Sequence, residues 1–286
     1  MAVQSILFLV KRGNLVKRRW IIILSLVVCI PLYFLWQNTH LVTTHYEIDV
    51  SNESLNGLRI VQLSDLHSKT FGDSQERLVS KVLDLEPDLI VLTGDMIDKN
   101  VESIDNHLNF LRNFTEEEVP VYAVSGNHEY WTNNLDEIKV IYDDLGVVFL
   151  DDESSEVTIN DTTLTLFGLS DRAKHPSDTA YLNALPEGEA QTFSLLLAHR
   201  PVFFNSYSEK NYALVLSGHA HGGMFRLPFI GGLYSPDQGL FPKLTTGPYK
   251  KEDTFLIVSR GLGNSVIPLR IMNRPEIVVV NLTYLE

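Results

Sequence analysis

The stretch Gly218-His219-Ala220-His221-Gly222-Gly223 follows 212–216, an apolar run with the length of a β-strand. If the backbone stays extended beyond Gly218, residues two apart point to the same side of the chain. His219 and His221 would then offer two imidazoles to one side, and two neighbouring metal ions could each bind one. A lone His-x-His pair is more often a polar turn after a strand, so the rest of the chain has to decide.

The remainder of the chain alternates strand-length apolar runs with amphipathic segments of helical length. In the first half we expect strands at 58–63, 88–92 and 119–124, and helices at 74–85, 102–114 and 135–145. In the second half we expect strands at 157–159, 163–169, 193–198, 212–216, 255–259 and 277–282. This alternation favours mainly parallel sheets covered by helices. Two sheets packed face to face, each with helices outside it, would accommodate both halves.

The chain has 286 residues, 44% of them hydrophobic, and carries a formal net charge of −13. Five cations precede the first acidic residue, Glu47. Without them, 18 Lys and Arg stand against 36 Asp and Glu, a balance of −18. So acidic a body is a poor candidate for non-specific binding of nucleic acid. If its ligand is an anion, it needs a local source of positive charge.

The N-terminal region predicts a membrane anchor. We divide the chain into a basic tail at 1–19, a transmembrane helix at 20–38, a stalk at 39–56 and a catalytic domain at 57–286. The positive-inside rule puts the N-terminus in the cytosol and the catalytic domain outside the cell membrane. A cleaved signal peptide is the main alternative, but no small-x-small site follows the apolar run. Cys29 is the only cysteine, so no disulfide forms within the chain.

Residue types that bind metals follow five of the expected strands. They are Asp65 and His67, then Asp95, then Asn127 and His128, then His199, and finally His219 and His221. Ligands of open α/β sheets collect at the carboxyl ends of strands. An Asp or His after one strand is ordinary turn chemistry, but five such strand ends are hard to explain in that way.

These residues predict a centre of two metal ions. Oxygen and imidazole ligands without thiolate suit Mn, Fe, Zn or Mg. Seven ligands are too many for one ion and suit two ions that share a bridge. Two divalent ions bring four positive charges, while two carboxylates and a bridging hydroxide return three, which leaves about one positive charge to hold a phosphate.

Taken together, five blocks resemble the signature of the calcineurin-like metallophosphoesterases. They are Asp65-x-His67, Gly94-Asp95, Gly126-Asn127-His128-Glu129, His199 and Gly218-His219-Ala220-His221, in the order of that family. The resemblance implies an α/β fold, a four-layer α/β/β/α sandwich with a dinuclear metal centre. It also implies that metal-bound hydroxide attacks the phosphorus of a phosphate ester.

The resemblance assigns a role to each residue. Asp65, His67 and His221 would hold the first metal, Asp95 would bridge the two, and Asn127, His199 and His219 would hold the second. His128 would be the general acid or a donor to the phosphoryl group, and both Asn127 and His128 would contact the substrate. Asp98, three residues after Asp95, would orient His128 or else act as a helix cap or turn residue.

The expected function is therefore that of a membrane-anchored phosphodiesterase or phosphatase, with manganese among the candidate metals. The segments 259–263 and 268–270 resemble the small membrane-associated branch related to UDP-diacylglucosamine hydrolases. Hydrolysis of a lipid-linked pyrophosphate is thus an alternative, and a non-catalytic phosphate-binding module is another. The segment 222–252, rich in Gly, Pro and aromatic residues, is either a binding loop or a packed surface excursion.

Overall fold

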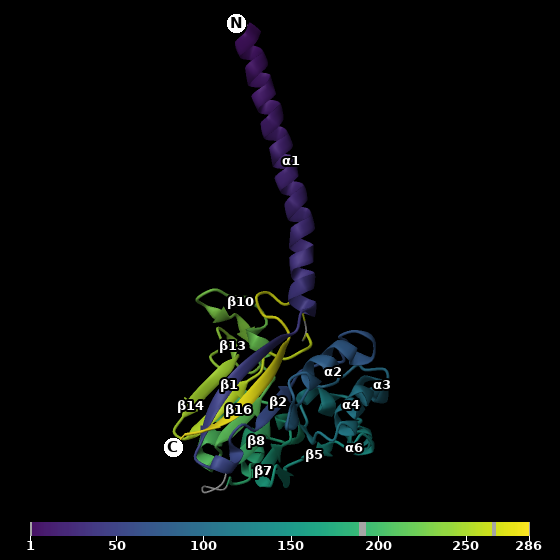
Figure 1. Ribbon diagram of the computed structural model, residues 1–286, viewed down its shortest axis with the longest axis vertical. Helices are drawn as coiled ribbons and strands as arrows, with labels where there is room; N and C mark the ends of the chain where they lie inside the picture. Colours follow the sequence, from purple (N-terminus) through teal and green to yellow (C-terminus); the bar gives the residue numbers. More distant parts are fainter. Residues whose placement is uncertain (1, 189–192, 265–266, 286) are drawn as a thin grey trace.

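Two six-stranded sheets form the centre of the molecule, and one long helix projects from it (Figure 1). The computed structural model describes residues 2–188, 193–264 and 267–285. The helix α1 (Ala2–Thr39) leads almost directly into the first strand, so that its end lies against the body.

The first sheet contains the strands expected in the first half of the chain and both chain-terminal strands. Its order is β1 (Val42–Val50), β16 (Glu276–Tyr284), β2 (Arg59–Leu63), β3 (Leu89–Thr93), β4 (Val121–Val124) and β5 (Val148–Phe149). The strands β2 to β5 run parallel, and β16 pairs antiparallel with β2. Every residue of β3 and β4 is buried, which explains why these strands read as continuous apolar runs.

The second sheet contains the remaining long strands. Its order is β14 (Gly247–Lys251), β15 (Thr254–Val258), β9 (Leu214–Ser217), β8 (Ser194–Ala198), β7 (Thr162–Leu169) and β6 (Glu153–Ile159). The four central strands are parallel, and the edge strands β14 and β6 are antiparallel to their neighbours.

The two sheets pack face to face, and helices cover their outer faces. Buried residues of both sheets, including Ile60, Val91, Leu197 and Leu216, form the core between them. The outer face of the first sheet packs on α2 (Glu76–Leu83), α3 (Ile104–Leu108), α4 (Arg112–Glu116) and α6 (Leu135–Asp144). The second sheet packs on α7 (Asp178–Ala184) and α8 (Phe204–Tyr207). The expected four-layer α/β/β/α sandwich is confirmed.

Two segments differ from expectation. The stalk expected at 39–56 contains β1, whose residues 42–50 pair in parallel with β16 more than 230 positions later in the chain. Most side chains of this edge strand are at least partly exposed, so its sequence lacks the apolar signal of a buried strand. The helix expected at 102–114 is broken into α3, a 3₁₀ turn at Asn109–Leu111 and α4. Asn at 106, 109 and 113 is a weak helix former, which accounts for the interruption.

The segment 222–252 is an ordered excursion beside the second sheet. It forms two small antiparallel ribbons, one of β10 (Arg226–Leu227) and β11 (Gly231–Gly232), the other of β12 (Tyr234–Ser235) and β13 (Gly239–Leu240). It then enters the sheet as β14. The turn between β12 and β13 carries Asp237, which contacts His219, one of the predicted ligands.

The part of α1 at Lys17–Thr39 has the length and composition of a membrane span. Its mean hydropathy is 2.1, and only 6% of its most apolar stretch is buried within the molecule. A row of exposed apolar side chains on an isolated helix is costly in water.

The core between the sheets supports the first prediction. Replacing Leu216, which is fully buried there, with Ala should lower the free energy of unfolding by ~2–5 kcal/mol, because the change leaves a cavity. The exposed Val140 of α6 is the matched control, and Val140→Ala should change stability by at most ~0.5 kcal/mol. Denaturant unfolding of the full chain in detergent, followed by circular dichroism, measures both. Equal losses would contradict the placement of Leu216 between the sheets.

Candidate metal centre

The carboxyl ends of five parallel strands meet along one edge of the sandwich and bring all seven predicted ligands together. The strands β2, β3 and β4 supply residues from the first sheet, and β8 and β9 supply residues from the second. Each of the seven side chains belongs to a residue at most 8% exposed: Asp65, His67, Asp95, Asn127, His199, His219 and His221. So many buried polar groups need partners.

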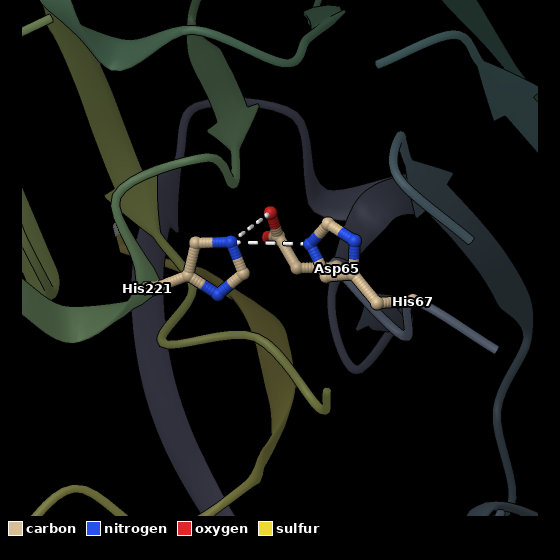
Figure 2. A group of neighbouring side chains, drawn as sticks. All are labelled: Asp65, His67 and His221. Carbon is tan, nitrogen blue, oxygen red and sulfur yellow. Dashed lines mark hydrogen bonds and ion pairs between the residues drawn. The ribbon is translucent and has the colours of Figure 1, made fainter. Parts of the chain in front are cut away.

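The first cluster is formed by Asp65, His67 and His221, which face one another in Figure 2. The Nε2 atoms of the two imidazoles lie 3.1 Å apart, and Nε2 of His221 lies 3.4 Å from Oδ1 of Asp65. Two ring nitrogens and a carboxylate that converge on one point form a donor set suited to a divalent ion.

The second cluster is formed by Asp95, His199 and His219. Nε2 of His199 lies 3.3 Å from Oδ2 of Asp95 and 3.1 Å from Nδ1 of His219. The other nitrogen of His199, Nδ1, lies 2.8 Å from the carbonyl oxygen of Thr93, to which it can donate. Such a bond fixes the tautomer and leaves Nε2 free to bind a metal.

Asp95 lies between the two clusters. Its Oδ2 is 3.7 Å from Nε2 of His67 in the first cluster and 3.3 Å from Nε2 of His199 in the second. Its Oδ1 accepts the backbone N–H of His128 at 2.8 Å. A carboxylate in this position is placed to serve both clusters.

Two further observations test whether the residues fit metal ions. Oδ1 of Asn127 is buried and has no hydrogen-bond partner, as expected of an amide oxygen that awaits a cation. Burial lowers the pKa of His67 to about 4 and that of His221 well below its usual range. Both imidazoles are therefore neutral near pH 7, which is the form that binds metal. The donor set fits divalent ions.

His199 differs in its electrostatics. Burial alone would lower its pKa, but the neighbouring carboxylate of Asp95 raises the pKa to about 10. A cation bound between them would take the place of this proton, since metal ligands bind in their deprotonated form.

Five of the seven residues adopt left-handed backbone conformations: Asp65, His67, Asp95, His219 and His221, with φ between 46° and 63°. The expected extended backbone beyond Gly218 is therefore wrong, since β9 ends at Ser217 and the chain then turns sharply. This turning sends His219 to the second cluster and His221 to the first. Non-glycine residues rarely accept such a conformation, and its strain is typical of functional sites.

Close backbone approach explains Gly218. A Cβ added there would lie 2.0 Å from Oγ of Ser64 and 2.3 Å from Oδ2 of Asp65. The absence of a side chain lets the next N–H, that of His219, donate to Asp65 at 3.0 Å. The glycine of this motif thus joins the loop after β9 to the loop after β2.

Glu129, on the short helix α5 (Asn127–Trp131), has a structural role that the sequence did not assign. Its buried carboxylate accepts the backbone N–H groups of Asp95, Met96 and Gly126 at 2.7–2.9 Å. It therefore ties the loop after β3 to the loop after β4. The only indication of this role in the sequence was that Glu129 ends the Gly-Asn-His-Glu block.

Asp237 is a second residue that the sequence analysis missed. Its Oδ2 accepts a bond from Nε2 of His219 at 3.0 Å and pairs with Nη1 of Arg200 at 2.5 Å. The guanidinium of Arg200 also grips the buried carboxylate of Asp171. A carboxylate behind an imidazole fixes its orientation toward a metal. No sequence signal marks Asp237, which belongs to the excursion at 222–252.

His128 and Asp98 lie at the edge of the centre. Nδ1 of His128 accepts the backbone N–H of Lys99 at 3.2 Å and lies 3.5 Å from Oδ2 of Asp98. The other oxygen of Asp98 accepts the N–H of Asn100, which closes a turn. The geometry therefore gives Asp98 a turn role and also places it beside His128.

All seven predicted ligands lie in a region that matches one protein family. A model of the calcineurin-like phosphoesterases matches residues 58–223, which is more than half of the chain. The chain belongs to this family. It is accordingly a metal-dependent phosphoester hydrolase, and the expected family is confirmed.

Three relatives illustrate the likeness. A metallophosphoesterase of Campylobacter jejuni is 30% identical over 287 residues, with 95% of this chain and 72% of that protein covered. The metallophosphoesterase YkoQ of Bacillus subtilis is 28% identical over 225 residues, with 77% of this chain and 82% of that protein covered. A "transmembrane protein with metallophosphoesterase domain" of Danio rerio is 31% identical over 243 residues, with 79% of this chain covered. This chain matches 53% of the length of that last protein.

The role of Glu129 supports the second prediction. Glu129→Gln should reduce the metal bound by the purified full chain and destabilise it by ~1–3 kcal/mol, because an amide NH₂ would face a buried backbone N–H. Elemental analysis and denaturant unfolding measure the two effects. The exposed Glu137→Gln on α6 is the control and should change neither. Unchanged metal content in Glu129→Gln would contradict the proposed tie between the loops.

Proposed function

We propose that this family member is a membrane-anchored phosphoesterase that uses two divalent ions. The observation that carries the proposal is the place of Asp95, whose carboxylate lies within 4 Å of imidazoles from both clusters. Asp65, His67 and His221 would hold one ion, and Asn127, His199 and His219 would hold the other. Mn, Fe, Zn and Mg all suit these ligands.

The chain's own residues divide the work. When bound, the ions would polarise the phosphoryl group and lower the pKa of a bound water. The side chain of His128 is 14% exposed, more than those of the seven predicted ligands. It can therefore contact a substrate that approaches from solvent. It would donate a proton to the leaving oxygen or a hydrogen bond to the phosphoryl group, with Asp98 behind it. Asn127 and His128 would both contact the substrate.

Turnover tests the enzymatic part of the proposal. The full chain in detergent, loaded with Mn, should hydrolyse bis(p-nitrophenyl) phosphate or p-nitrophenyl phosphate, and a chelator should abolish the reaction. Release of nitrophenolate measures both substrates and ranks diester against monoester. Protein with two bound metal equivalents and no turnover of either ester would favour the alternative of a phosphate-binding module.

Two substitutions separate metal binding from proton transfer. Asp95→Asn should lose metal and activity together, because it removes the charge shared by the two clusters. His128→Ala should keep its metal and lose rate by ~10²–10⁴-fold, as expected for a general acid. Elemental analysis and kcat of the purified variants measure the outcome. Equal metal loss in both variants would mean that the two roles are wrongly assigned.

We also propose that α1 crosses the cell membrane, with the N-terminus in the cytosol and the catalytic domain outside. Three features support this topology: the apolar part of α1, the cluster of cations before it and the transmembrane relative in Danio rerio. Hydrolysis of a lipid-linked pyrophosphate is the second candidate function. The exposed apolar side chains of Phe229, on the β10–β11 ribbon, and of Ile267, in the segment that contacts the end of α1, favour it.

A further inference from the structure

The end of α1 is held against the body by specific contacts. Oδ1 of Asn38 accepts the backbone N–H of Arg270 at 3.1 Å, and the carbonyl oxygen of Asn38 accepts from Nζ of Lys69 at 2.6 Å. The guanidinium of Arg274 lies 4.7 Å from the ring centre of Trp36. Since β1 begins only a few residues later, the body is not free to turn about a long stalk. One face of it therefore lies at a fixed place beside the end of α1 (Figure 1).

That face carries exposed apolar side chains from two joined segments. One is the tip of the β10–β11 ribbon, with Phe229 fully exposed and Ile230 more than half exposed. The other is the segment before β16, with Ile267 and Met272 exposed. The segments touch, because Arg226 donates its backbone N–H to the carbonyl oxygen of Ile271 at 3.0 Å. Figure 1 shows the β10 ribbon on the same side of the body as the end of α1.

The composition of the ribbon tip is unusual for a turn exposed to water. Pro228-Phe229-Ile230 stands where turns generally carry Asn, Asp or Ser, and Phe229 adopts a left-handed φ of 67°. Aromatic and aliphatic side chains exposed together mark a contact surface. Cations lie close by, because Arg77 and Arg274 contact the last turns of α1. Apolar tips flanked by cations suit the interface of a bilayer, with its apolar chains and phosphates.

The same segments lie beside the candidate metal centre. A cavity of about 10 Å³, lined by Met224, Ile267, Leu269 and Arg270, adjoins His221. The side-chain amide of Asn273 donates to the carbonyl oxygens of His221 and Met224 at 2.7 and 3.0 Å. The segment that holds the end of α1 therefore also supports a residue of the first metal cluster.

We propose that this face, comprising the β10–β11 tip and residues 267–272, docks on the lipid bilayer, with Phe229 and Ile230 inserted at headgroup depth. The side of the candidate metal centre at His221 then lies near the surface of the bilayer. This inference rests on the proposed membrane anchor. It adds a second contact between body and bilayer, one that the anchor alone does not require.

Depth measurements in nanodiscs of phosphatidylethanolamine and phosphatidylglycerol test the docking. An environment-sensitive nitrobenzoxadiazole label is placed on Phe229→Cys, Met272→Cys or Val140→Cys in the full chain with Cys29→Ser. Labels at 229 and 272 should emit at shorter wavelength than the label at 140 and be quenched by lipids with a nitroxide near the headgroup. Val140 is the control, because it is an exposed apolar residue on α6, far from α1 in Figure 1.

A label on the native Cys29 tests the membrane anchor separately from the docking of the body. Cys29 lies within the apolar part of α1 and should be quenched by lipids with a nitroxide deep in the acyl chains. Quenching at 29 without quenching at 229 or 272 overturns the docking and leaves the anchor intact. No quenching at 29 overturns both. A shift to shorter wavelength at 229 without quenching by lipid assigns the face to contact with protein, and likewise overturns the proposal.

Discussion

The carboxylate of Asp95 is the group on which the rest of the site depends. It is buried together with a second carboxylate and four imidazoles. A buried charge loses its hydration, and this loss is destabilising unless protein groups or ions compensate for it. Three partners converge on it: His67, His199 and the backbone N–H of His128. The Nε2 atoms of His67 and His221 face each other at 3.1 Å, although both imidazoles are neutral. Cations at these two places would satisfy both the carboxylates and the nitrogen lone pairs.

The fold holds these charged and polar side chains in fixed positions. The loops at the carboxyl edge are joined to one another by hydrogen bonds that leave little freedom. Glu129 joins the loops after β3 and β4, while Gly218 lets the loop after β9 contact Asp65 from the first sheet. Left-handed residues at five of the seven positions cost on the order of 1–3 kcal/mol each, which a core as extensive as that between the sheets can offset.

The sequence predicted the ligand set because of a general property of parallel sheets. Strand ends that carry Asp, Asn or His meet at one edge, so that residues 65 to 221 could be grouped without knowing the order of the strands. This reasoning does not predict which strands pair when they lie far apart in the sequence. The pairing of β1 with β16 was therefore missed, and β1 was taken for a stalk. The local turn after β9 was also wrong, because alternation assumes an extended backbone that His219 and His221 do not have. Asp237 escaped notice because only the folded excursion at 222–252 brings it to His219.

The relation between α1 and the metal centre follows from the distribution of charge. A body with a balance of −18 is repelled by anionic lipids, so that general electrostatic attraction cannot orient it on a membrane. The orientation of the body relative to α1 has to come from local contacts. Arg270 provides such contacts both to α1 and to the body. Its backbone N–H binds Asn38 of α1, while its buried guanidinium donates to the carbonyl oxygens of Arg260, Gly261 and Asn273. Asn273 in turn binds the backbone of His221. A short series of hydrogen bonds thus links α1 to His221, one of the predicted ligands, and keeps the site at a constant position relative to α1.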